Sequence, residues 1–177
     1  MTSIIPPHIL EVIAKNGTPA QRKLAEQSLK ESEKLREIRI SEMERAIPLQ
    51  APFTSPHKNR LIYDAKNTTN LPGSLVRNEG QSPTNDIEVN EVYDGLGATF
   101  DLYWEVFKRN SIDDKGMDLI GSVHVGNEWD NAMWNGTQML FGDGDQTIFN
   151  RFTIAIDIMG HEVNYNRLKA VAWNEAT

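Results

Sequence analysis

The side chains best suited to chemistry lie near the C-terminal end, between Asn150 and Asn166. His161-Glu162 is the first half of an H-E-x-x-H pattern. In that pattern two imidazoles one helical turn apart bind zinc, and the glutamate acts as general base on the metal-bound water. Tyr165 stands where the second histidine is needed. Asp157, His161 and Tyr165 are spaced by four residues and share one face of a predicted helix. The stretch therefore predicts a hydrolytic metal site that lacks one ligand, with a buried structural histidine as the alternative.

Composition limits what else the chain can do. It has no cysteine, so a metal site must use carboxylates and the four histidines. The net charge of -7 falls on residues 51–177, which argues against a nucleic-acid partner. No apolar run approaches the roughly 18 residues of a membrane span, so we expect no membrane partner. The N-terminus lacks a basic region followed by a long apolar region, and we expect a cytoplasmic chain, or one released without a classical signal peptide.

Residues 1–50 predict a small helical unit. Pro6 and Pro7 precede a short helix over residues 8–15, and Gly17 ends it. Thr18-Pro19-Ala20-Gln21 matches a capping box, which opens a long amphipathic helix to about Ile47. Such a helix needs a surface to lie on, and it is either a packing helix or a removable inhibitory segment. The proline-rich stretch 48–56 predicts a linker and a domain boundary.

The remaining residues alternate strand and helix patterns. We expect strands over 60–65, 74–77 and 120–125, with His124 as a structural strand residue. An aromatic stripe predicts a core-forming helix over 86–109. Asn135-Gly136 predicts a hairpin between the strands 128–134 and 137–141. Gly142-Asp143-Gly144-Asp145 is typical of a tight turn and lacks the spacing of an EF-hand calcium loop. A helix over 150–166 then positions the candidate site.

Several segments, taken in order, resemble the thermolysin-like zinc peptidases. They are 71–73, 76–80, 93–97, 109–111, 130–136, 139–145 and 157–162. The segment Ile5-Pro6-Pro7-His8-Ile9-Leu10 resembles the short propeptide of the protealysin subgroup, with Pro6, Pro7 and Leu10 carrying the motif. The resemblance covers residues 4 to about 163. It implies an α+β fold, with a helical pro-segment (1–50) packed on a β-rich thermolysin-like N-terminal domain (51–177).

The resemblance also implies residue roles and partners. His161 would be a zinc ligand, Glu162 the general base, and Asp157 a carboxylate of the calcium-binding type. Asn131 and Ala132 would lie on an edge strand that hydrogen-bonds an extended peptide, with Trp134 supporting that strand. The partners would be peptide or protein substrates, together with the chain's own propeptide in the active-site cleft.

The sequence departs from the family where zinc should bind. A neutral phenol such as Tyr165 is a poor zinc ligand. Glu175 resembles the third ligand, but only nine residues separate it from Tyr165. The family's C-terminal helical domain is missing. We therefore expect the N-terminal part of a zinc metalloendopeptidase precursor that is inactive as this chain. Two alternatives are an active peptidase whose zinc is held by His161, Glu175 and a second chain, and a non-catalytic module that binds a peptide or a homologue.

Overall fold

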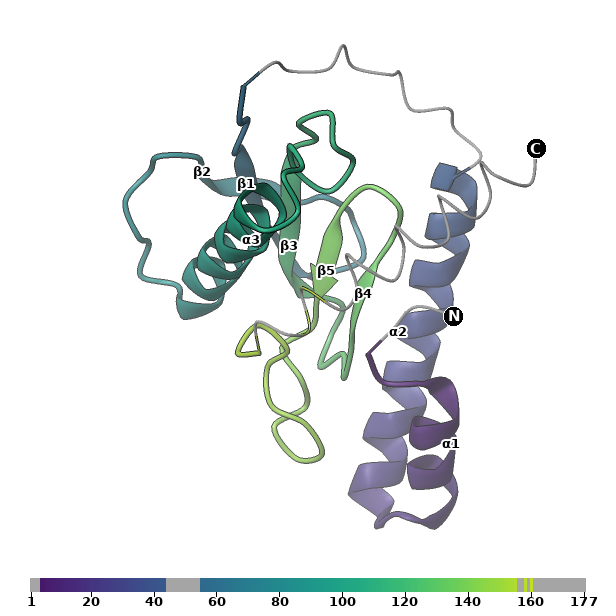
Figure 1. Cartoon of the computed structure of the whole chain (residues 1–177). Coiled ribbons are helices and arrows are strands. Elements are labelled where there is room, and N and C mark those ends of the chain that lie inside the picture. The colour runs from purple at the N-terminus through teal and green to yellow at the C-terminus, as the bar shows by residue number, and fades with distance from the viewer. Residues whose placement is uncertain (1–3, 44–54, 156–157, 159, 161–177) are drawn as a thin grey trace, which may run out of the picture.

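The computed structural model describes residues 4–43, 55–155, 158 and 160. Within these residues the chain forms helices packed on one mixed five-stranded sheet (Figure 1). The elements in chain order are α1 (Pro7–Asn16), α2 (Pro19–Met43), β1 (Arg60–Thr68), β2 (Ser74–Asn78), α3 (Ile87–Glu105), β3 (Leu119–Val125), β4 (Ala132–Trp134) and β5 (Met139–Phe141). The α+β class predicted from the sequence is confirmed.

The strand order of the sheet is β2-β1-β3-β5-β4. The pairs β1–β2 and β4–β5 are antiparallel, whereas β1–β3 and β3–β5 are parallel. The parallel strands β1 and β3 need a crossover connection, and the chain makes it through β2 and α3. The short hairpin β4–β5 therefore ends the sheet, and β4 is its edge strand.

The two faces of the sheet are buried by different helices. Ala132, Trp134, Met139 and Phe141 belong to the core cluster that includes α3. The residues between them, Met133 and Leu140, belong to a second cluster with Leu35 of α2. Because side chains alternate across a strand, each short strand contributes to both cores. The helix α2 therefore covers the face of the sheet opposite α3 (Figure 1).

The helix starts follow the sequence signals. Pro7 occupies the first turn of α1, and the chain turns at Gly17. The capping box before α2 is complete, because the Thr18 N–H donates to Gln21 Oε1 at 2.9 Å and the Gln21 N–H donates to Thr18 Oγ1 at 3.3 Å. Residues 44–47, the predicted end of this helix, lie outside the described residues.

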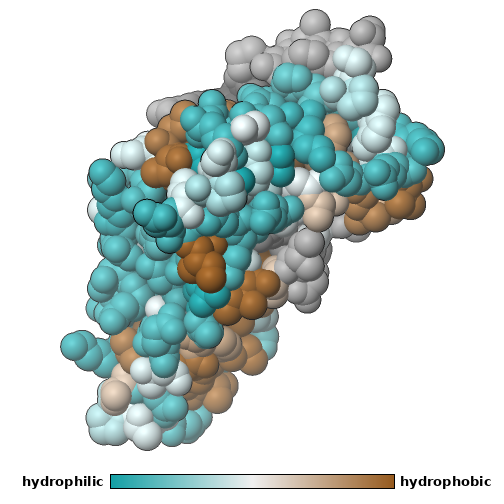
Figure 2. All heavy atoms as spheres, turned by 90° about the vertical axis from the view of Figure 1, so that its left-hand side faces the viewer, coloured by the Kyte–Doolittle hydropathy of each residue, from teal (hydrophilic) through white to brown (hydrophobic). Residues whose placement is uncertain are grey.

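The helix predicted over 86–109 is shorter than expected. Asp86 is its N-cap, accepting from the amides of Glu88 and Val89, but the helix ends at Glu105. Lys108 has a φ of 54°, in the left-handed region that a continuing helix excludes. Figure 2 shows the left-hand side of Figure 1, which is mostly hydrophilic with apolar groups in a few places. The exposed apolar residues include four at the end of this helix: Leu102, Trp104, Val106 and Phe107.

Two further boundaries were predicted wrongly. Residues 128–131 form a loop before β4 rather than strand. Residues 150–155 form turns, so the final helix does not begin at Asn150. The Phe152 N–H donates to the carbonyl of Gly142 at 3.2 Å, and Glu91 of α3 holds both Arg151 and Thr153. These contacts bind the stretch to β5 and α3, which competes with helix formation.

Candidate functional site

The N-terminal segment lies along the edge strand β4. The Ile4 N–H donates to the Ala132 carbonyl at 3.1 Å, a main-chain bond between positions more than a hundred residues apart. In Figure 1 the segment passes beside β4 before α1 begins. Ala132 is the first residue of the edge strand β4, and this edge holds an extended segment of the same chain.

Asn131 holds the next residue of that segment from both sides. Its Oδ1 accepts the Ile5 N–H at 2.9 Å, and its Nδ2 donates to the Ile5 carbonyl at 3.0 Å. The side chain is fully buried, and the Asn131 carbonyl accepts the Gly142 N–H at 3.0 Å. One asparagine side chain therefore satisfies both backbone groups of a bound residue.

The propeptide motif residues place the segment. Pro6 is the N-cap of α1 in an extended conformation, and Pro7 follows in the first turn. Leu10, at 1% exposure, is the buried residue of that helix. The two prolines therefore fix the change from the extended segment beside β4 to the helix α1. Trp134, also predicted from the sequence, lies in β4 with its side chain in the core shared with α3.

The loop that leads into β4 contacts α2 through two hydrogen bonds. Trp129 Nε1 donates to Ser32 Oγ at 2.9 Å, and the Asp130 N–H donates to Ser28 Oγ at 2.8 Å. Both serines and Trp129 are buried. These contacts were not predicted from the sequence, because serines on a charged helix are usually surface residues. The same stretch of chain, 129–132, thus binds α2 and the N-terminal segment.

Two carboxyl groups lie close together at this loop. Asp130 Oδ1 accepts the Asp145 N–H at 2.8 Å, and both side chains are buried. Among the described residues Asp130 Oδ2 and Asp145 Oδ2 have no hydrogen-bond partner. Burial, together with the neighbouring Asp145, raises the pKa of Asp130 from 3.8 to about 8. Asp130 is therefore protonated in the folded chain at neutral pH.

The substitution Asp130→Asn is expected to stabilise the fold more at pH 8 than at pH 5. The folded chain keeps a proton between about pH 4 and pH 8 that the unfolded chain has lost, so Asp130 lowers stability as the pH rises through this window. An asparagine amide removes the titration and can donate to Asp145. We expect a gain of about 1–3 kcal/mol in the free energy of unfolding at pH 8, measured by urea denaturation. The exposed Asp94→Asn is the control, and an equal gain at both pH values would contradict the assignment.

His124 lies in a strand, as predicted from the sequence, and it also joins a cluster of carboxylates. It lies in β3, but its φ of 51° is left-handed and uncommon for a non-glycine residue. Its Nδ1 lies 2.9 Å from Asp143 Oδ1 and its Nε2 lies 2.9 Å from Asp86 Oδ2. The hydrogen bond with Asp143, and then that with Asp86, raises the pKa of His124 to about 10 against the opposing effect of burial. A spacing rule could not find this cluster, because its members come from three separate elements.

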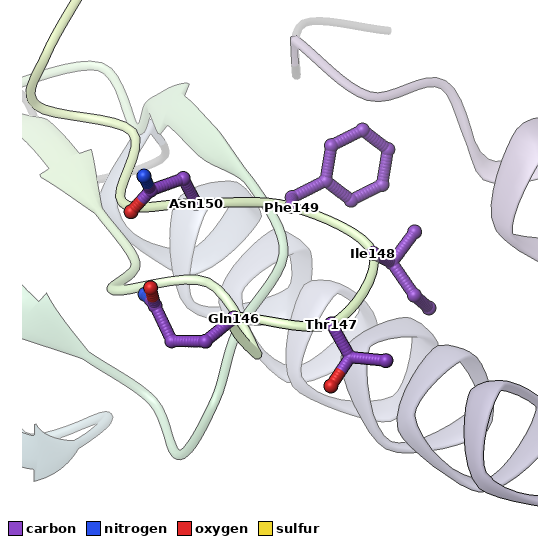
Figure 3. Close-up of a pocket in the computed structure, with 5 residues that line it drawn as sticks. All are labelled: Gln146, Thr147, Ile148, Phe149 and Asn150. Atoms are coloured by element: carbon purple, nitrogen blue, oxygen red, sulfur yellow. The ribbon is translucent and has the colours of Figure 1, made fainter.

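A shallow pocket lies in the loop after β5. Asp145 Oδ1 accepts the amides of Thr147 and Ile148, which folds this loop back on itself. In Figure 3 the side chains around the pocket point in different directions and do not converge on one centre. None of them is charged, and we assign no site here. The lining residues are Gln146, Thr147, Ile148, Phe149 and Asn150.

The predicted metal and catalytic residues lie outside the described residues. They are Asp157, His161, Glu162, Tyr165 and Glu175. The geometry available for the site is therefore that of the β4 edge, the contacts of residues 129–130 with α2 and the cluster around His124.

Comparison with known proteins agrees with this arrangement. A family model described as the thermolysin metallopeptidase catalytic domain matches residues 27–165. A model described as the protealysin propeptide matches residues 2–36. The residues that form α1 and much of α2 thus match a propeptide, and the sheet with α3 matches a catalytic domain.

Individual relatives give the same result. An extracellular metalloprotease of Pectobacterium carotovorum subsp. carotovorum is 47% identical over 163 residues, which are 92% of this chain and 46% of that protein. Protease PrtS of Photorhabdus sp. (strain Az29) is 42% identical over 170 residues, 96% of this chain and 46% of that protein. The precursor of protealysin, a metalloproteinase from Serratia proteamaculans, superposes with a TM-score of 0.76 at 47% identity, covering 91% of this chain and 44% of that one. The chain spans about half the length of the relatives it matches.

The comparisons correct one expectation. A cytoplasmic location, or release without a classical signal peptide, was predicted from the N-terminal residues. That prediction is wrong, because the Pectobacterium relative is an extracellular metalloprotease. Among the helices that the structure describes, none has the length and apolar character to cross a membrane.

Proposed function

Because this chain belongs to the thermolysin family of metallopeptidases and carries a protealysin-type propeptide, we propose that it is part of a zinc-dependent endopeptidase precursor whose β4 edge binds peptides. In this proposal residues 4–5 occupy the substrate edge until the propeptide is removed. The observation that carries it is the pairing of Ile4 with Ala132 and of Ile5 with Asn131.

The contacts at the edge suit an extended peptide of varied sequence. The bond from Ile4 to Ala132 uses main-chain atoms alone, and Asn131 binds the N–H and the carbonyl of one residue. Addition of a strand to a sheet edge gains affinity from such main-chain bonds, whereas side-chain pockets set specificity. A substrate bound in this way would need the groups that Ile4 and Ile5 occupy, so the segment and the substrate would compete.

The helix α2 would make this competition effective. It is anchored through Ser28 and Ser32 to residues 129 and 130, directly before the edge strand. Tethering the segment close to its binding edge raises its effective concentration without any new contact. We propose domains of 1–50 for the propeptide and 51–177 for the catalytic part, so that cleavage between them frees the edge.

The catalytic residues enter the proposal from the family pattern. We propose His161 as a zinc ligand, Glu162 as the general base, Glu175 as a further zinc ligand and Asp157 as a calcium-type carboxylate. The donor set does not fit a complete zinc site, because a catalytic zinc takes three protein ligands and Tyr165 replaces an imidazole. We therefore propose that this chain by itself does not hydrolyse peptides. A non-catalytic module that binds a peptide or a homologue is the second candidate, since the β4 edge contacts require no metal.

The substitution Asn131→Ala tests the occupied edge. It removes both hydrogen bonds to Ile5, each to a buried side chain, and we expect about 1–3 kcal/mol less protection of the segment. Amide hydrogen exchange at Ile4 and Ile5 should then be about tenfold to a hundredfold faster. Asn16→Ala is the matched control, because Asn16 donates to the Val12 carbonyl within α1.

Two outcomes would contradict the proposal in different ways. Unchanged exchange at Ile4 and Ile5 in Asn131→Ala would mean that the segment does not depend on this edge. Zinc-dependent cleavage of a peptide by the unmodified chain would leave the edge assignment intact and refute the proposed inactivity. A third result would favour the binding module. In it, the N-terminal segment leaves the β4 edge without any dependence on Asn131, and the chain then binds peptides without cleaving them.

A further inference from the structure

Four ionisable side chains from distant parts of the chain meet at one end of the sheet. Asp86 and Glu88 come from the start of α3, His124 from the end of β3, and Asp143 from the loop after β5. The candidate ligand atoms of Glu88, His124 and Asp143 all lie within 4.8 Å of one another. All four side chains are partly exposed, so an ion could reach the cluster from solvent.

The cluster carries more negative charge than its own histidine can neutralise. Three carboxylates surround one imidazole, which leaves an excess of negative charge even when the imidazole is protonated. Glu88 Oε2 is shielded from solvent and has no hydrogen-bond partner among the described residues. A shielded carboxylate oxygen that accepts no hydrogen bond is a position that a cation would satisfy.

The surrounding hydrogen bonds orient the cluster inward. Asp143 accepts Asn67 Nδ2 on its Oδ2, which leaves Oδ1 toward His124. Asp86 caps α3 through Oδ1, which leaves Oδ2 toward His124 Nε2. Each of these two carboxylates is therefore fixed by one oxygen and presents the other to the imidazole.

We propose that Glu88, His124 and Asp143 form a divalent metal site, best suited to zinc, in which Asp86 orients the imidazole. Zinc ligands lie at roughly 2.0–2.2 Å from the ion, so two ligands of one ion are at most about 4.3 Å apart. His124 Nδ1 is 2.9 Å from Asp143 and 3.9 Å from Glu88 Oε2, and both separations meet this limit.

The chemistry of the donors selects the metal. Calcium and magnesium prefer all-oxygen sites, whereas imidazole with carboxylates suits zinc. A metal-bound histidine commonly donates its other ring N–H to a carboxylate, which fixes the tautomer. His124 has that arrangement, with Nδ1 toward the ligands and Nε2 toward Asp86. The site shares no residue with the proposed catalytic set, so the two proposals can be tested separately.

A proton is the competing occupant. Without metal, a doubly protonated His124 would donate to Asp86 and Asp143 in a partly exposed ion-pair network. Zinc would take the place of the Nδ1 proton and leave the Nε2 proton toward Asp86. Nitrogen-15 spectra of His124 distinguish the two states, because a metal-bound Nδ1 and a protonated Nδ1 have different chemical shifts.

The test uses the full chain with His161→Ala, so that zinc bound by the family ligand is not counted. We expect one zinc per chain after dialysis, measured by elemental analysis, and a change in the His124 Nδ1 signal on addition of zinc. Glu88→Gln should weaken zinc binding at least tenfold, and Asp86→Asn, which retains an N-cap residue, about tenfold to a hundredfold. His57→Asn is the matched control, since His57 forms an ion pair with Asp118, at 3.4 Å, away from the cluster.

Three results would overturn the proposal. The first is the absence of both bound zinc and a zinc-dependent His124 signal in the folded chain. The second is zinc binding that Glu88→Gln and Asp86→Asn leave unchanged, or that His57→Asn weakens equally. The third is binding of calcium in preference to zinc. Circular dichroism of each metal-free variant separates loss of a ligand from loss of the fold.

Discussion

Replacement of Trp129 by alanine is expected to lower the free energy of unfolding by about 3–5 kcal/mol, the range for a buried tryptophan. The Trp129 side chain is fully buried in the cluster that joins Leu35 of α2 to Met133 and Leu140 of the sheet. Its Nε1 also donates to Ser32 Oγ. The substitution therefore removes core packing and a hydrogen bond to α2 at once, and equilibrium urea denaturation measures the total.

Two smaller changes separate these contributions. Ser32→Ala removes the hydrogen bond alone and should cost about 1 kcal/mol. Trp129→Phe keeps most of the ring and should cost clearly less than Trp129→Ala. In the double variant, Ser32→Ala should add little to Trp129→Ala, because its partner is already absent. Hydrogen exchange in α2 should rise in Trp129→Ala, and unchanged exchange there would show that this residue does not hold the helix.

Substitution of Gly142 by alanine is expected to destabilise the chain by about 3 kcal/mol, at the upper end for overpacking. A Cβ atom at this position would overlap the Trp129 carbonyl oxygen and touch the Trp129 ring. The Gly142 N–H also donates to the Asn131 carbonyl, so the backbone cannot move away without breaking that bond. The clash is with backbone rather than a flexible side chain, and relaxation would disturb the segment that binds α2 and the N-terminal residues.

Gly160→Ala is the matched control for this prediction. Among the described residues, a Cβ atom there would meet no heavy atom within 4 Å, and the stability should change by less than about 1 kcal/mol. Thermal and urea denaturation of both variants, with exchange at Ile4 and Ile5, would report the stability and the state of the edge. A stable Gly142→Ala with normal protection of Ile4 would mean that the close approach to Trp129 is not needed.

The contacts join the propeptide and the catalytic part through one short stretch of chain. Residues 129 and 130 hold α2, whereas 131 and 132 hold the N-terminal segment. Because these residues are consecutive, loss of α2 and release of the edge would be coupled. This arrangement would allow the proposed propeptide both to complete a core and to occupy the proposed binding edge.

The sequence alone determined the features that depend on near neighbours. The Thr18–Gln21 box, the prolines at the start of α1 and the stripe of α3 all follow from contacts within a few residues. The ordered motifs also predicted the family and the α+β class.

Tertiary structure decided the features made by residues far apart in the chain. Three such features join separate elements of the chain. They are the hydrogen bonds of Asn131 with Ile5, the contact of Trp129 with α2, and the cluster of His124 with Asp86, Glu88 and Asp143. Residues 150–155, predicted as helix, form turns because Glu91 and Gly142 bind them. Helical periodicity and capping act over one or two turns, whereas these contacts exist only once the sheet has brought its strands and loops together.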